Sequence, residues 1–179
     1  MRERMDAIER PLGLPWCWGA TETEVLADYP CTGRLSGPVI AVHRAVDVAA
    51  PAEVTFRWLC QLKHGTYSYR LLGGSPKVLT AGADDLAVGQ EMMIFRLVDF
   101  ASGEHLTGET SPELLGRYGP ITCSYTVRPA RDASSRIVVR TEISVQSRAR
   151  RLKAIMLAWA DLAMMSKQLR VLKRLAESS

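Results

Sequence analysis

The sequence predicts an α+β domain in which an antiparallel sheet is covered by one long C-terminal helix. No glycine or proline follows Ser147, and apolar residues recur at three- and four-residue steps over 148–176. This pattern predicts a single helix about 40 Å long. Before it, residues 121–128 and 137–146 alternate apolar and polar side chains, which indicates two half-buried strands. The apolar face of such strands needs a cover, and the helix is available to supply it.

A length of 179 residues fits one domain with an additional segment, and 23% charged residues with 47% hydrophobic residues exclude global disorder. Residues 1–37 are punctuated by proline and glycine, which argues against long regular elements. Trp16 and Trp18 predict that this stretch is packed and not free. We therefore expect an N-terminal arm at 1–37 that packs on a domain at 38–179.

The elements expected after the arm follow from alternating apolar and polar residues and from the positions of proline and glycine. Residues 39–48 alternate with one apolar face, and Pro51 with Glu53 suits the start of a helix. In order, we expect a strand at 39–48, a helix at 51–62, a loop at 64–76, strands at 90–100 and 105–110, the strand pair described above and the terminal helix.

The terminal helix has a second apolar line beside the first, so its apolar arc is wider than one flat sheet would cover. The excess predicts a curved sheet, a bound ligand or a partner chain, which includes a possible homodimer. Methionines in the chain suit a core, and they equally suit the wall of a cavity for varied apolar ligands.

The net charge of +4 is modest, and its cations gather at the two ends of the terminal helix. Cations suit the C-terminal end of a helix and are disfavoured at its start. The group at the start predicts either pairing with carboxylates of a neighbouring strand or contact with an external anion. No aromatic residues are interleaved with it, so we expect no nucleic-acid partner. The groups are Arg148, Arg150, Arg151 and Lys153, and Lys167, Arg170, Lys173 and Arg174.

The four cysteines are scattered, with no C-x-x-C pair and no histidine at zinc-ligand spacing. This predicts reduced thiols, no metal and no other cofactor. The N-terminus has no apolar run, and the apolar window 152–165 is too short for a membrane span and contains Lys153 and Asp161. We expect a soluble, cytoplasmic protein.

Several stretches together resemble a known superfamily. They are 49–54 (Ala-Ala-Pro-Ala-Glu-Val), which opens the first helix, 58–62 (Trp-Leu-Cys-Gln-Leu), which ends it, 15–21 in the arm, and 67–69 (Tyr-Ser-Tyr) in the loop. Nearly the whole chain resembles the START-related helix-grip superfamily of polyketide cyclase/dehydrase and lipid-transfer proteins, in particular an uncharacterised, largely actinobacterial branch. That branch usually has Asp where this chain has Arg70, and commonly a Gly-rich, Arg-containing stretch at 64–66, so the role of the acidic position is not carried over.

The resemblance implies a helix-grip fold: a curved antiparallel sheet wrapped around the C-terminal helix, with an apolar cavity between them. Members bind lipids, sterols, polyketides or plant hormones, and some catalyse cyclisation or dehydration. The main hypothesis is a module that binds a hydrophobic small molecule without chemistry. A cyclase/dehydratase-type enzyme and a non-catalytic interaction protein with a filled cavity are the alternatives, because fold alone does not decide function.

Catalysis in such a cavity would need acid/base groups in apolar surroundings. His105 and Glu109 lie four residues apart on one expected strand, so they share a face. If that face lines the cavity they form an acid/base pair, and if it is the outer face they are solvated. The residues that we expect to line the ligand site are Trp58, His64, Tyr67, Tyr69, Arg96, Tyr125, Arg140, Met156 and Trp159.

Overall fold

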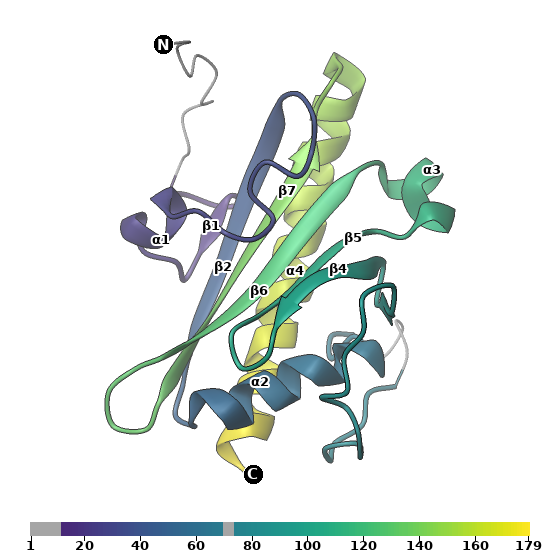
Figure 1. Ribbon diagram of the computed structural model, residues 1–179. Coiled ribbons are helices and arrows are strands. Elements are labelled where there is room, and N and C mark those ends of the chain that lie inside the picture. Colours follow the sequence, from purple (N-terminus) through teal and green to yellow (C-terminus); the bar gives the residue numbers. More distant parts are fainter. Residues whose placement is uncertain (1–11, 70–73) are drawn as a thin grey trace.

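A computed structural model describes residues 12–69 and 74–179 (Figure 1). Its strands form one seven-stranded sheet in the order β1-β2-β7-β6-β5-β4-β3, antiparallel except for the β1–β2 pair. In chain order the elements are β1 (Cys17–Trp18), α1 (Glu22–Leu26), β2 (Val39–Val48), α2 (Ala52–Cys60), the 3-10 turn η1 (Gln61–Lys63), β3 (Glu91–Met92), β4 (Phe95–Ala101), β5 (His105–Thr110), the 3-10 turn η3 (Pro112–Leu114), α3 (Leu115–Tyr118), β6 (Ile121–Pro129), β7 (Ser135–Ser144) and α4 (Arg148–Glu177).

The predicted terminal helix is confirmed as α4, which runs along one face of the sheet, here called the inner face (Figure 1). Ser147 caps it by accepting a hydrogen bond from the backbone N–H of Arg150. Ala154 and Ala158 are fully buried, and such small side chains let the helix approach β2 closely. None of the described helices is long and apolar enough to cross a membrane.

The rotation of α4 differs from the expected one. The stripe expected to face the sheet contains Leu152, Met156 and Trp159, and these three side chains are exposed. The N-terminal half of α4 instead turns Ala154, Ala158, Asp161 and Met165 to the sheet, at steps of four, three and four residues. Farther along, the buried face continues through Leu169, Leu172 and Ala176.

The predicted hairpin of 121–128 and 137–146 is confirmed as the antiparallel pair β6–β7, in which Tyr125 lies opposite Val139. The single strand expected at 90–100 is corrected to a tight hairpin. Met93 has φ +58°, a left-handed conformation that breaks the extended run, so Met92 pairs with Phe95 across the turn.

The opposite, outer face of the sheet is partly covered by residues that precede β2. Cys17–Trp18 pairs in parallel with β2, and Tyr29 and Cys31 pack with Ala45 and Val138. Residues 1–11 of the expected arm and Arg70 lie outside the described residues, and the boundary at residue 37 stays a prediction.

Candidate ligand-binding site

A pair of buried charges joins the inner face to α4. Arg44 on β2 reaches Asp161 on α4, with its Nη2 2.9 Å from the carboxylate Oδ2. The guanidinium also donates to the backbone carbonyls of Trp16, His43 and Ala158 at 2.9–3.2 Å. Burial raises the pKa of Asp161 to about 6, although Arg44 opposes the shift. The pair lies on the side of α4 that faces the sheet, so Trp159, two residues from Asp161, lies on the far side of the helix.

Large aromatic side chains fill the inner face beyond this pair. Trp58 is buried, donates from Nε1 to Ser179 Oγ at 2.9 Å, and lies edge-on to Tyr67 with ring centroids 6.3 Å apart. Tyr125 donates its hydroxyl to Gln168 Oε1 at 2.9 Å. The Tyr67 hydroxyl is buried without a hydrogen-bond partner, and burial raises its pKa to about 12.

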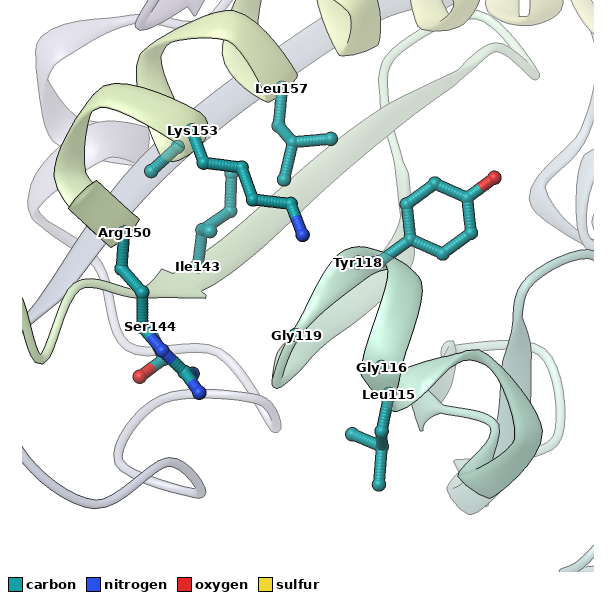
Figure 2. A pocket seen from close by; sticks show the side chains of 10 residues that line it. Leu115, Gly116, Tyr118, Gly119, Ile143, Ser144, Arg150, Lys153 and Leu157 are labelled. Atoms are coloured by element: carbon teal, nitrogen blue, oxygen red, sulfur yellow. The ribbon is translucent and has the colours of Figure 1, made fainter.

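A pocket of about 100 Å³ lies between the N-terminal turns of α4, α3 and the end of β7 (Figure 2). Its wall combines apolar groups with cationic and hydroxyl groups. The lining residues are Leu115, Gly116, Tyr118, Gly119, Ile143, Ser144, Arg150, Lys153, Ala154 and Leu157.

The local sequence explains how these residues meet. Gly119 has φ +81° and ends α3, which returns the chain into β6 beside the start of α4. A Cβ atom at Gly119 would lie 3.7 Å from Arg150 Nη1, so the guanidinium rests close to this turn. Lys153 lies one turn farther along α4 and donates to the backbone carbonyl of Arg117. Figure 2 shows both cations and Leu157 projecting from α4 toward the gap beside α3.

The pocket has a positive electrostatic character. None of the four cations of the first α4 turns forms an ion pair with a described carboxylate, and the first turn contains no acid. The predicted pairing with carboxylates of a strand is therefore not observed. Ser144 is 5% exposed, lines the pocket, and has no hydrogen-bond partner for its Oγ. Cationic donors, a free hydroxyl and a helix N-terminus are the groups that hold anions in proteins.

Across residues 12–69 and 74–179, no group of three or more His, Cys, Asp or Glu side chains could hold a metal ion. The four cysteines are free and buried, and burial raises their thiol pKa values.

Comparisons with solved structures support the topology described above. A structural-genomics protein from Nitrosomonas europaea superposes with a TM-score of 0.53 and 11% identity, over 77% of this chain and 94% of that one. A protein from Mesorhizobium loti gives 0.50 and 11%, over 78% and 98%. The aromatase/cyclase Zhui from Streptomyces sp. R1128 superposes less well, with a TM-score of 0.43 and 10% identity over 78% of this chain and 94% of that one. No protein-family model and no curated protein sequence matches the chain.

The chain has the helix-grip fold. A seven-stranded sheet wraps along one long C-terminal helix, as the resemblance to START-related proteins implies. The sequence identities are low, so the similarity to these structures extends to the fold alone.

In this helix-grip frame, three of the expected ligand-site residues lie on the inner side. Trp58, Tyr67 and Tyr125 are part of the main hydrophobic core. Each contacts other protein groups, and none of them lines the described pocket.

His105 and Glu109 share a face, as expected, but it is the outer face, because Leu106 between them points into the core. His105 Nε2 lies 3.6 Å from Asp99 Oδ2. Glu109 Oε1 accepts from Arg34 Nε at 2.8 Å. No hydrogen bond joins the two residues, so the structure does not assemble the proposed acid/base pair.

The two candidate arginines also lie on the outer face. Arg96 is half-exposed and pairs with Glu91 at 3.1 Å and more loosely with Glu113. Arg140 is buried and donates from Nε and Nη2 to Glu142 at 3.0 and 2.8 Å. Neither guanidinium is available to a ligand on the inner face.

The remaining candidates are exposed. His64 follows η1 at the surface, and Tyr69 lies under the ammonium of Lys167, 4.2 Å from its ring centroid. Met156 and Trp159 point away from the sheet, so they cannot line a cavity between sheet and helix.

Sequence reasoning missed Arg44, Asp161 and Ser144. A signal existed for the first two: Arg44 interrupts the apolar face of β2, and Asp161 is the single acid of α4 before Glu177. Arg150 and Lys153 belong to a cationic cluster that is visible in the sequence, but the turn at Gly119 that encloses them is a tertiary contact.

Proposed function

We propose that the protein binds a small amphipathic molecule that has a hydrophobic body and an anionic group. The observation that carries this proposal is that Arg150, Lys153 and Ser144, whose hydroxyl has no hydrogen-bond partner, line one pocket whose apolar wall includes Leu115 and Leu157. The helix-grip fold supports a binding role in general terms.

The size of the pocket limits what it holds. Small-molecule sites usually measure roughly 300–1,000 Å³, and this pocket measures about 100 Å³. It therefore accepts the anionic end and the first part of the hydrophobic body, and the rest of the ligand extends from it. A carboxylate or phosphate matches the charge-assisted donors.

Binding without chemistry is the function that the geometry favours. The cyclase/dehydratase alternative depends on an acid/base pair in a cavity, and His105 and Glu109 lie on the outer face.

The test compares octanoate with octanol, which share a chain and differ in charge, by chemical-shift titration. Octanoate should bind more tightly and shift the amides of Ser144 and Leu157. The Arg150→Gln/Lys153→Gln variant should lose roughly tenfold or more of the affinity for octanoate, with little change for octanol. Arg174→Gln, which removes an exposed cation near the other end of α4, is the matched control. Equal binding of octanoate and octanol, or an unaffected double variant, would overturn the proposal.

A further inference from the structure

The face of α4 that points away from the sheet carries an apolar ridge. Leu152, Met156 and Trp159 are 63%, 67% and 52% exposed, and they follow each other at steps of four and three residues. Ala163 continues the line one turn farther on, and Met164 is exposed beside it. We name Leu152, Met156, Trp159 and Ala163 the α4 ridge. Over these residues the helix advances about 16 Å.

Cations surround the ridge, and acids are missing from it. Arg148 and Arg151 lie at its N-terminal end, and Lys167 and Arg170 follow its C-terminal end. The two acids of α4 are otherwise engaged: Asp161 faces Arg44, and Glu177 binds Lys173 and the backbone N–H of Ala49. The exposed side of the helix is therefore apolar along its middle and positive at both ends.

Two of these cations are held at the surface by aromatic rings. The Lys167 ammonium lies 4.2 Å from the ring centroid of Tyr69, and the Arg170 guanidinium lies 5.2 Å from the Trp18 ring. Such contacts keep the two cations beside the α4 ridge. Tyr69, which is 42% exposed, lies at the border of the ridge.

We propose that the α4 ridge lies on an anionic lipid surface, with its apolar side chains in the interfacial region and the flanking cations on lipid headgroups. A helix with a tryptophan-containing apolar face and cations along its borders is the arrangement that binds in the plane of a bilayer surface. The ridge is convex, so a deformable surface covers it more completely than a rigid one. This inference does not rest on the proposed ligand.

The charges argue against a second copy of this chain as the occupant. A two-fold pairing of the ridges would bring Arg148 and Arg151 against the cations of the other copy, with no acid on either face to compensate. Like charges placed together oppose association. An anionic surface meets the same cations favourably.

The test is co-sedimentation of the full chain with vesicles. Vesicles of equal parts phosphatidylcholine and phosphatidylglycerol should bind the protein, pure phosphatidylcholine should bind it weakly, and added salt should release it. Tryptophan emission should shift to shorter wavelength on binding, because Trp159 leaves water.

Met156→Gln/Trp159→Gln should reduce vesicle affinity roughly tenfold or more, since the apolar contact is lost. Leu26→Gln/Val88→Gln, which changes two other exposed apolar residues, should bind as the parent does. Arg148→Gln/Arg151→Gln should lose the preference for anionic vesicles. The ridge variant Met156→Gln/Trp159→Gln and the cation variant Arg148→Gln/Arg151→Gln change exposed side chains, and an unchanged circular dichroism melt confirms their folding.

Vesicle binding that is unaffected by the ridge variant would overturn the inference, as would absent binding at low salt. A dimer in light scattering that Met156→Gln/Trp159→Gln dissociates would assign the ridge to a second copy and overturn it as well. The pocket residues Arg150 and Lys153 are left intact in these variants. Failure of the membrane inference is therefore separable from failure of octanoate binding.

Discussion

Arg44 on β2 and Asp161 on the long helix α4 form an ion pair of 2.9 Å between the sheet and that helix. The carboxylate Oδ2 is buried, and the guanidinium donates from Nη1 and Nη2 to three backbone carbonyls as well, whereas its buried Nε has no hydrogen-bond partner. A cation with this many acceptors does not depend on the carboxylate alone. The pair lies on the side of α4 that meets the sheet, together with the buried Ala154 and Ala158.

The first prediction concerns the pH dependence of this pair. The folded-state pKa of Asp161 is about 6, above the unfolded value of about 3.9. The folded state thus binds the proton more tightly, and the stability from this group is fully present below pH ~3.9 and is lost as pH rises through ~6. Relative to Asp161→Asn, the parent should gain about 1.4 kcal/mol between pH 7 and pH 5.

Urea unfolding of both proteins at several pH values measures this difference, and groups common to both cancel. Asp47→Asn is the control, because Asp47 is largely exposed in its contact with Arg136. A difference between parent and Asp161→Asn that stays constant with pH would contradict the prediction.

The second prediction concerns Glu24, whose contribution to stability rises with pH, whereas that of Asp161 falls. Hydrogen bonds from Arg136 hold the pKa of Glu24 down at about 2, against about 4.3 unfolded. Glu24 therefore stabilises the fold above pH ~4.3, and this stability is lost as pH falls toward ~2. Glu24→Gln should cost roughly 3 kcal/mol at pH 7 and far less near pH 2. Glu22→Gln, on the exposed side of the same helix, should change little in parallel denaturant titrations.

The sequence predicted the elements better than their orientation. The bounds of α4 follow from an unbroken run without glycine or proline, and the β6–β7 hairpin follows from strict alternation. Apolar residues surround α4 on several sides, so periodicity alone gave Leu152 and Trp159 the same weight as Leu169 and Leu172. The observed rotation places Asp161 against Arg44, a contact between positions 117 residues apart along the chain that periodicity does not show.

The site was predictable only in its charges. The cluster that contains Arg150 and Lys153 is visible in the sequence, and its unfavourable place at a helix start predicts either pairing with carboxylates of a strand or contact with an external anion. The pocket exists because α3, a short helix between two predicted strands, ends at Gly119 against Arg150. The pairing of His105 with Glu109 rested on spacing, which fixes a shared face but not which face of the sheet is covered.

The third prediction compares two buried tyrosines. The Tyr67 hydroxyl has no partner, so Tyr67→Phe removes an unsatisfied polar group and should be neutral or stabilising by about 1 kcal/mol. Tyr125→Phe removes a hydrogen bond to Gln168 and should destabilise by roughly 1–2 kcal/mol. Thermal and urea unfolding of the two variants side by side provide the comparison. A clear loss of stability in Tyr67→Phe would show that its hydroxyl has a partner in solution.

The fourth prediction tests how the segment before β2 is attached. Gly19 has φ +76°, and a Cβ atom there would lie 2.2 Å from the carbonyl oxygen of Ala45. Gly19→Ala therefore combines backbone strain with a clash against backbone, and should destabilise the protein by more than ~2 kcal/mol. Gly13→Ala is the matched control, since a Cβ at Gly13 meets nothing within 4 Å.

Hydrogen exchange locates the effect of that change. The His43 amide donates to the carbonyl of Trp16 at 2.7 Å across the β1–β2 pair. In Gly19→Ala this amide should lose protection against hydrogen exchange. The amides of the β6–β7 pair should lose only as much protection as the fall in the global free energy of unfolding accounts for. Equal loss at both places would mean that the parallel β1–β2 pair unfolds only with the whole domain. Retained protection at His43 would mean that the backbone accommodates the new methyl group without releasing β1.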